Sequence, residues 1–306
     1  MNEPARELVV VGAGPAGVSA ALWARSRNLD VLVLETGSGP GGQLHQIHFE
    51  PREIAGWLTG GGRALASAYA RQLAEAGLPV RYGAEARSLG VGDELALHLT
   101  SGERVRARAV LVTTGARRRR LEVPGEREFE DRGVSYSATR DRDALAGRDV
   151  VVVGGGDAAV ENALMLASLG GHIVLLARGA LRARAEFRER LSREPHIRVA
   201  EHTRVREIAG RDRVERVRVS GPGGEQVLAC EAVVVKVGVV PNTEWCRESL
   251  AHDPEGYLRV DDRLATSVPG VWAAGDVVRP ILPCVPVATG QGALAVAAIR
   301  AALRGT

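Results

Sequence analysis

The stretch "ELVVVGAGPAGVSAALWARSRNLDVLVLE", residues 7–35, decides the fold. It reads as a short apolar strand, a glycine-rich turn, an amphipathic helix and a second apolar strand, which is the pattern of a βαβ unit. The turn is Gly12-x-Gly14-x-x-Gly17. In such a turn the first glycine permits the bend, the second lets the backbone approach a pyrophosphate, and the third lets the helix lie close to the strand. The stretch therefore predicts a dinucleotide-binding domain.

The same pattern returns at residues 148–178, "RDVVVVGGGDAAVENALMLASLGGHIVLLAR", with the turn Gly154-x-Gly156-x-x-Ala159. One glycine motif is a weak signal, whereas two motifs that each stand between a strand and a helix are a strong one. We therefore expect an α/β fold with two Rossmann-like, three-layer ββα nucleotide-binding domains, the second inserted into the first.

The residue that ends the second strand of each unit predicts which nucleotide it binds. Glu35 stands 23 positions after Gly12, and a carboxylate there accepts a hydrogen bond from a free ribose 2′-OH, as FAD requires. Arg178 takes the corresponding place in the second unit and Arg182 follows one turn later. Guanidinium groups there suit a 2′-phosphate. We expect FAD in the first unit and NADPH in the second. NADH stays open, because both arginines are also explained as ordinary exposed residues.

The composition is that of an ordinary water-soluble chain. Of 306 residues, 45% are hydrophobic and 25% charged, which suffices for two domains with separate cores. The longest uncharged run, residues 280–299, contains prolines and glycines, so it predicts a loop leading into a buried helix and no membrane span. The N-terminus passes directly from a short polar lead into a strand. We therefore expect no targeting peptide and a cytoplasmic location.

The basic residues give little support for a nucleic-acid partner. The isoelectric point is about 9.0, but the net charge is only +3. Lys236 is the only lysine, so 39 of the 40 basic residues are arginines, a bias that is typical of genome composition. The run Arg117–Arg120 is expected to be a solvated turn between the domains.

The three cysteines, at 230, 246 and 284, have no Cys-x-x-Cys spacing. No cluster of cysteine and histidine has the spacing of zinc ligands, so neither a disulfide framework nor a metal site is expected. Cys230 and Cys246 are interpreted as structural residues.

Further motifs follow the two glycine turns in a fixed order. They read "GGQL" at 41–44, "VTTGA" at 112–116, "VPGE" at 123–126, "RGVSYSATR" at 132–140, "VGVVPNT" at 237–243 and "PGVWAAGDV" at 269–277. From end to end, this order resembles the family of low-molecular-weight thioredoxin reductases, the class II pyridine nucleotide-disulfide oxidoreductases. Its relatives include ferredoxin/flavodoxin–NADP reductases and small disulfide reductases.

The resemblance implies specific site residues, with Gly42 and Gln43 against the flavin and Gly275 and Asp276 along the ribityl chain and its phosphate. The FAD residues are Gly12, Gly14, Pro15, Ala16, Gly17, Glu35, Gly42, Gln43, Thr114, Gly115, Gly275 and Asp276. The NAD(P)H residues are Gly154, Gly156, Asp157, Ala158, Ala159, Arg178 and Arg182.

The resemblance also implies domain limits and assembly. The FAD domain is expected at 1–117 and 245–306, and the NAD(P)H domain at 118–244, with a two-stranded linker near 115–118 and 243–247. Such relatives are usually homodimers.

The chain departs from this family where the family keeps its redox-active Cys-x-x-Cys. The two cysteine positions read Ser137 and Arg140, with no gap in the alignment. Neither side chain cycles between thiol and disulfide, so reduction of thioredoxin by the usual dithiol relay is excluded.

Other residues are candidates for lesser roles. Cys284 stands before the last helix, near the expected flavin, and is a candidate redox thiol, although a free cysteine is often only a small buried apolar residue. Lys236 lies in an apolar run, where burial would depress its pKa unless its side chain reaches the cofactor cleft or solvent. His45 and His48 follow "GGQL" and are interpreted as loop residues.

The leading hypothesis is an FAD enzyme that takes hydride from NAD(P)H and passes electrons directly to an unidentified acceptor. A ferredoxin- or flavodoxin-like protein, a small molecule and O₂ are the candidate acceptors. A small-disulfide reductase that uses Cys284 is one alternative, and a flavin-binding protein without turnover is another.

Overall fold

The chain divides into two compact units in a computed structural model that describes residues 4–47 and 50–305. The first unit comprises residues 1–117 and 240–306, and the second comprises residues 118–239. The chain passes between the units through β7 (Ala116–Arg118) and β16 (Val239–Pro241), which pair as a two-stranded sheet.

The first unit is built on a seven-stranded sheet of order β3-β2-β1-β6-β5-β4, with β17 paired to β6. Five strands are parallel: β1 (Arg6–Val11), β2 (Val31–Glu35), β3 (Val80–Tyr82), β6 (Arg104–Val112) and β17 (Val271–Ala273). The antiparallel strands are β4 (Ala86–Gly90) and β5 (Leu95–Leu99). Because β6 is nine residues long, its first half pairs with β5 and its second half with β17.

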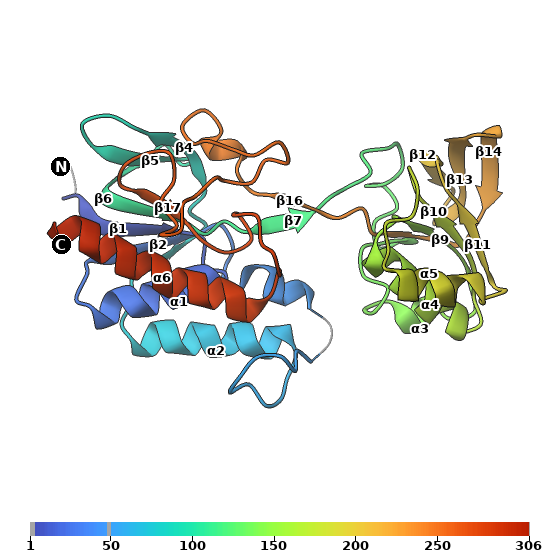
Figure 1. The fold of residues 1–306 in the computed structure, drawn as a ribbon, viewed down its shortest axis with the longest axis horizontal. Coiled ribbons are helices and arrows are strands. Elements are labelled where there is room, and N and C mark those ends of the chain that lie inside the picture. The colour runs from blue at the N-terminus through green and yellow to red at the C-terminus, as the bar shows by residue number, and fades with distance from the viewer. Residues whose placement is uncertain (1–3, 48–49, 306) are drawn as a thin grey trace. The chain divides into compact units, whose positions relative to one another are not determined.

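Alternation along β1 separates the two faces of this sheet, as the two-residue period of a strand requires. Leu8 and Val10 pack on the side of the helices, and Val9 and Val11 pack on the side of β4 and β5 (Figure 1).

The helices are α1 (Pro15–Ser26), α2 (Gly62–Glu75) and α6 (Val285–Arg304). Short 3₁₀ turns are η1 (Gly42–Gln46) and η2 (Glu244–Cys246). Burying each such Leu or Val stabilises the fold by about 1.5–3 kcal/mol, and the result is a three-layer ββα unit.

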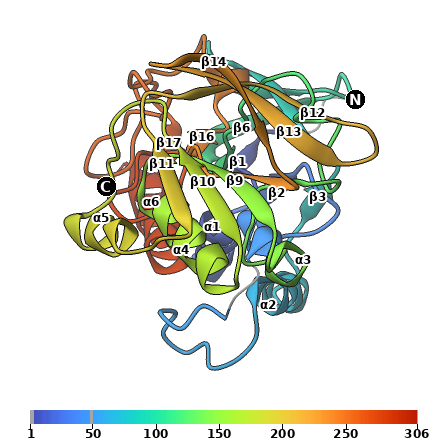
Figure 2. The same cartoon turned by 90° about the vertical axis from the view of Figure 1, so that its right-hand side faces the viewer.

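The second unit repeats this architecture with a five-stranded parallel sheet of order β11-β10-β9-β15-β8. Its strands are β8 (Val134–Ser135), β9 (Asp149–Val153), β10 (His172–Leu176), β11 (Ile197–Ala200) and β15 (Ala232–Val235). One face carries α3 (Arg142–Leu145), α4 (Asp157–Ser168) and α5 (Ala185–Ser192). The other carries an antiparallel sheet of β12 (Arg204–Gly210), β13 (Val214–Gly221) and β14 (Gly224–Ala229) (Figure 2).

The two units share one topology. The order β3-β2-β1-β6 in the first unit corresponds to β11-β10-β9-β15 in the second, and an antiparallel layer covers the same face in each. The predicted α/β fold with two Rossmann-like units of three layers is therefore confirmed. The repeat seen in the sequence at 7–35 and 148–178 is the first βαβ segment of each unit.

The chain returns to the first unit earlier than the sequence indicated. The units meet between Val239 and Val240, whereas the sequence placed the boundary at 244/245. The reason lies at Asn242, whose Nδ2 donates to the Thr114 carbonyl at 2.8 Å and whose own carbonyl accepts from Thr114 Oγ1 at 2.7 Å. These bonds attach residues 240–244 to the end of β6.

Helix α6 follows a loop, as the sequence predicts, but only one face of it is buried. An 18-residue window of the 20-residue helix has a mean hydropathy of 1.2, so by length and composition alone the helix is able to cross a membrane. The structure instead buries one face of it in the helical core of the first unit, and the core helices of soluble proteins share this composition. Its buried residues are Ala288, Gly292, Ala295, Val296 and Ile299.

The contact between α1 and α6 generates a prediction about two glycines of one helix. A Cβ on Gly292 would lie 2.2 Å from the Ala16 carbonyl oxygen, whereas a Cβ on Gly290 would meet nothing within 4 Å. We expect Gly292→Ala to lower the free energy of unfolding by about 1–3 kcal/mol through overpacking. Gly290→Ala, the matched control, raises it by up to about 1 kcal/mol through helix propensity. Urea unfolding followed by circular dichroism measures both, and equal effects would contradict the close approach of the helices.

Candidate functional site

The glycine turn of the first unit is shaped by backbone contacts on two sides and is open on the third. Gly12 has φ +105°, and a Cβ there would lie 2.5 Å from the Thr113 carbonyl oxygen. A Cβ on Gly17 would lie 1.9 Å from the Gly12 carbonyl oxygen, but a Cβ on Gly14 would meet nothing within 4 Å. The protein therefore requires the outer glycines for its own packing, and the middle glycine faces space that a ligand can occupy.

Helix α1 begins at this open position. Gly14 is its N-cap and makes no side-chain cap bond, and Pro15 and Ala16 form the start of the first turn. The N–H groups at the start of a helix lack intrahelical partners and bear partial positive charge. Together with the space above Gly14, this arrangement fits a pyrophosphate.

Glu35 is held rigidly beside the turn and is only 9% exposed. Its carboxylate accepts the Ala13 N–H at 2.7 Å, the Gly37 N–H at 2.7 Å and the Thr36 hydroxyl at 3.2 Å. A carboxylate offers about four acceptor positions, so one remains for a ribose hydroxyl. The geometry fits the predicted role.

The structure brings the "GGQL" and "PGVWAAGDV" motifs to the same place. A Cβ on Gly42 would lie 3.4 Å from the Gly14 Cα, and Gln43 Nε2 donates to Asp276 Oδ2 at 3.0 Å. Burial raises the pKa of the Asp276 carboxyl. Gly275 has φ +80° and donates its N–H to Gln291 Oε1 at 2.7 Å. Residues 12–17, 41–43 and 275–276 thus form one site within the first unit.

Sequence reasoning chose Thr114 and missed its neighbour. The Thr114 side chain bonds to Asn242, and Gly115 adopts φ +64° next to it. Thr113 instead touches the glycine turn, because its Oγ1 donates to the Gly12 carbonyl at 2.8 Å. The double threonine of "VTTGA" directly after β6 contained this signal, since two adjacent residues in extended backbone point in opposite directions.

The second unit has the same turn. Gly154 has φ +150°, and a Cβ there would lie 2.2 Å from the Lys236 carbonyl oxygen, whereas a Cβ on Gly156 would meet nothing within 4 Å. Ala159 is fully buried where the helix packs on the strand. Asp157 and Ala158 begin α4, and the Asp157 carboxylate accepts the backbone N–H and Nε of Arg184, each at 2.8 Å.

Arg178 and Arg182 both lie in the segment that follows β10. Each is exposed, and the Arg182 N–H donates to the Gly155 carbonyl at 2.7 Å, which folds this segment against the glycine turn. Within residues 4–47 and 50–305, neither guanidinium has a hydrogen-bond or ion-pair partner. Both are therefore available to an anionic ligand of the second unit.

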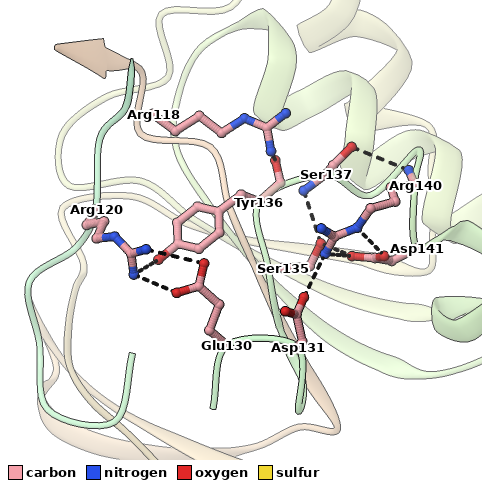
Figure 3. Close-up of polar contacts among 9 residues, drawn as sticks. All are labelled: Arg118, Arg120, Glu130, Asp131, Ser135, Tyr136, Ser137, Arg140 and Asp141. Carbon is pink, nitrogen blue, oxygen red and sulfur yellow. Dashed lines mark hydrogen bonds and ion pairs between the residues drawn. The ribbon is translucent and has the colours of Figure 1, made fainter. Parts of the chain in front are cut away.

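Ser137 and Arg140, the two positions at which the resemblance implies cysteines, belong to a closed polar network at the end of β8 (Figure 3). Ser137 is 6% exposed, and its Oγ accepts the Arg140 N–H at 3.3 Å. The Arg140 guanidinium bonds to Asp141 at 2.6 and 2.8 Å and to Asp131 at 3.1 Å. Ser135 Oγ donates to Asp141 at 2.6 Å. Charge-assisted bonds of this kind fix the segment 135–141.

Tyr136 links this network to the arginine run. Its hydroxyl donates to Glu126 at 2.8 Å and accepts from Arg120, which also bonds to Glu130 at 2.8 and 3.2 Å. Burial and the bond to Glu126 raise the pKa of the Tyr136 phenol. The segment 117–120 lies where the chain passes between the units, and Arg117 and Arg119 are exposed, as expected. It is not a turn, however, because β7 and these side-chain bonds order it.

Lys236 and Arg118 meet at a single backbone oxygen. Lys236 Nζ donates to the Tyr136 carbonyl at 2.9 Å, and Arg118 Nη1 donates to the same oxygen at 2.8 Å. Burial, and secondly the Arg118 charge, lower the pKa of the Lys236 amine to about 8, and Glu161 opposes this shift. Neither the tyrosine nor the arginine was singled out from the sequence.

The cysteines and His45 lie in different environments and do not form a common site. Cys230 and Cys246 are buried, and burial raises the pKa of each thiol to about 12, which suits structural residues. Cys284 is half-buried at the N-cap of α6. His45 Nε2 lies 3.0 Å from the Pro40 carbonyl oxygen, and His48 lies outside the described residues. In the described ranges, no three residues of the metal-ligating types are grouped.

A match to a family model shows which protein family the chain belongs to. The model for pyridine nucleotide-disulphide oxidoreductases matches residues 6–292. The chain belongs to this family. It is an FAD-dependent NAD(P)H oxidoreductase of thioredoxin reductase type.

Individual relatives support this assignment. The chain is 37% identical to thioredoxin reductase of Treponema pallidum over 94% of each chain. It is 33% identical to NADH dehydrogenase of Ferdinandcohnia aciditolerans over 94% of this chain, but spans only 56% of that longer protein. Among solved structures, Lactococcus lactis thioredoxin reductase has a TM-score of 0.82 at 29% identity and covers 98% of this chain and 100% of its own.

The open glycines predict two separable losses. We expect the Gly14→Ala variant to fold normally but to bind FAD with an affinity lowered at least about tenfold. The reason is that a methyl group enters the space above the helix N-terminus. Gly156→Ala should keep FAD and lose affinity for NAD(P)H to a similar extent. Flavin absorbance of the purified protein and calorimetric binding of the nucleotide measure the two effects.

The matched control is Gly92→Ala, because that glycine of the β4–β5 turn also has open space around its Cβ. We expect it to change neither ligand. If Gly14→Ala retains a full complement of FAD, the assigned pyrophosphate position is wrong.

Lys236 predicts a dependence of stability on pH. Its folded-state pKa of about 8 lies below the ordinary 10.5, so between these values the unfolded chain binds more protons and stability rises with pH. At pH 7, Lys236→Met should therefore be more stable than the wild type by about 1 kcal/mol after allowance for solvent screening. The advantage should disappear by about pH 10.5.

Thermal unfolding across this pH range measures the difference. Arg211→Met, in the exposed β12–β13 turn, is the control for effects of charge removal alone. A constant difference between Lys236→Met and the wild type from pH 7 to pH 10.5 would contradict the lowered pKa.

Proposed function

We propose that this oxidoreductase takes hydride from NADPH and passes electrons from the flavin directly to an acceptor other than thioredoxin. The observation that carries the proposal is the replacement of both dithiol positions by Ser137 and Arg140, inside a network of charge-assisted hydrogen bonds. Neither side chain has a reversible thiol–disulfide couple. The open positions at Gly14 and Gly156 support retention of both dinucleotides.

The chain's own residues have binding and orienting roles in this reaction. FAD, when bound, supplies a centre that accepts a hydride and releases electrons in one or two steps. The α1 N-terminus and Gly14 fit its pyrophosphate, Glu35 fits its adenosine ribose, and the paired Gln43 and Asp276 fit its ribityl hydroxyls. The role of the protein is then to hold the flavin and to decide what reaches it.

The acceptor is proposed by chemical class. Ferredoxin- or flavodoxin-like proteins, small oxidants and O₂ all take electrons from a reduced flavin without a thiol relay. Relatives other than thioredoxin reductases, among them NADH dehydrogenase of Bacillus subtilis at 32% identity, support a broad range of acceptors within this fold. That relative exceeds the chain in length, since the match spans 57% of it.

The preference for NADPH rests on Arg178 and Arg182, whose exposed guanidinium groups follow β10. NADH is the competing donor, and Glu201 is the residue that favours it, because its carboxylate lies in the same region. Glu201 Oε1, however, already accepts the Leu181 N–H at 2.6 Å. We further propose that the protein is a cytoplasmic homodimer and that it has neither nucleic-acid nor membrane partners.

The second candidate is a small-disulfide reductase that uses Cys284. Its half-exposed position at the start of α6 favours this candidate over either buried cysteine. Cys284→Ser separates the two proposals. Unchanged NAD(P)H-dependent turnover in that variant rules the thiol out.

An anaerobic titration of the FAD-loaded protein tests the proposed function. We expect about one equivalent of NADPH to bleach the flavin, a higher concentration of NADH to be needed for the same effect, and Escherichia coli thioredoxin to stay oxidised. Ser137→Ala and Arg140→Ala should leave the bleaching rate within about twofold, because neither residue takes part in hydride transfer. Failure of both nucleotides to bleach the flavin would favour a flavin-binding protein without turnover.

A further inference from the structure

The strand order of the second unit determines where the two halves of a bound dinucleotide must lie. In the order β11-β10-β9-β15-β8, the chain leaves β9 through α4 toward β10, and β15 pairs on the other side of β9. The point at which the order reverses therefore lies between β9 and β15. Ligands of open α/β sheets bind at this point, outside the carboxyl ends of the strands.

The pyrophosphate and adenosine positions fix the direction of the ligand. Gly154 and Gly156 follow β9, and Arg178 follows β10. If the pyrophosphate lies over the glycine turn and the adenosine over the end of β10, the nicotinamide half extends over the ends of β15 and β8. The residues that follow those two strands are Lys236 and Tyr136.

This edge carries an unusual concentration of positive charge. Lys236 Nζ and Arg118 Nη1 both donate to the Tyr136 carbonyl, so the two cationic nitrogens lie no farther apart than two hydrogen-bond lengths. The charged groups that act on Lys236 are Arg118 from β7 and Glu161 from α4. Arg118 in turn faces Arg140 and Asp141. Within the described part of the chain, Lys236 has no carboxylate as an ion-pair partner.

The choice of lysine at this position is itself informative. All 39 other basic residues are arginines, and an arginine stays charged at every accessible pH. A half-buried lysine loses its proton readily, and here the amine has a pKa of about 8. The only lysine side chain of the chain therefore lies at the predicted nicotinamide end of the second unit.

We propose that Lys236 is a positioning residue that makes the second unit bind reduced nicotinamide dinucleotide in preference to the oxidised form. The inference rests on the proposed nucleotide site. The oxidised nicotinamide ring carries a positive charge and is repelled by the ammonium group and by Arg118, whereas the dihydronicotinamide ring is neutral. The carboxamide oxygen, present in both forms, accepts a hydrogen bond from an ammonium donor. Lys236 thus favours departure of the oxidised product and weakens its competition with the reduced donor.

The size of the effect follows from Coulomb's law. For two unit charges several ångströms apart in a partly solvated site, the repulsion corresponds to about a three- to tenfold difference in affinity. It should be present at pH 7, where Lys236 is charged, and should diminish at pH 9.5, where most of it is neutral.

Calorimetric titration of the FAD-loaded protein with three ligands tests this inference without turnover. The ligands are NADP⁺, the redox-inert 1,4,5,6-tetrahydro-NADP with its neutral ring, and adenosine 2′,5′-bisphosphate, which lacks the nicotinamide half. In the wild type, we expect NADP⁺ to bind about three- to tenfold more tightly at pH 9.5 than at pH 7 when normalised to the bisphosphate. The tetrahydro analogue should show no such gain.

Two variants separate charge from packing. Lys236→Met should bind NADP⁺ with the higher affinity at both pH values, and Lys236→Arg with the lower affinity at both. Arg211→Met, far along the chain in the β12–β13 turn, should behave like the wild type. FAD content and thermal unfolding confirm that each variant is folded.

Equal ratios of NADP⁺ to tetrahydro-NADP affinity in the wild type and Lys236→Met, at both pH values, would overturn the inference and leave the nucleotide site intact. If none of the three ligands binds, the proposed nucleotide site is wrong and the inference falls with it.

Discussion

Both units depend on one steric constraint. At the first glycine of each turn, a backbone carbonyl of a neighbouring segment fills the space that a Cβ atom would need. In the first unit the carbonyl of Thr113 abuts Gly12, and in the second that of Lys236 abuts Gly154. No Cβ fits at either position. This contact fixes the end of β1 against β6, and that of β9 against β15. The start of each helix, and the open middle glycine, are set as a consequence.

The two units put the same scaffold to different uses through the residues at the ends of their second strands. Glu35 is buried and bonded to three neighbouring groups, so it presents a rigid acceptor. Arg178 is exposed in the corresponding segment, so it presents a cation that is open to solvent. The difference reflects desolvation, because a buried carboxylate needs fixed donors around it, whereas an exposed guanidinium remains hydrated.

The segment in which the resemblance implies a dithiol is a fixed polar structure in this chain. Ser135, Ser137, Arg140 and Asp141 bond to one another, and Tyr136 joins them to Glu126 and Arg120. The same segment supplies the carbonyl on which Lys236 and Arg118 converge. The fixed polar segment therefore lies beside a concentration of charge at the carboxyl edge of the second sheet.

The sequence by itself determined the α/β class, both glycine turns and the absence of a Cys-x-x-Cys, because each depends on residues close together along the chain. It missed Thr113 and the strand β7 within residues 117–120, and it placed the second boundary five residues late. Only the tertiary structure decided these points, since they depend on which strand lies beside which. Asn242 meets Thr114, and Lys236 meets Tyr136, across more than 90 residues of chain. The second contact arises because the parallel strands β15 and β8 end at one edge of a sheet, and the first joins segments that follow strands of two different sheets. No local pattern encodes either contact.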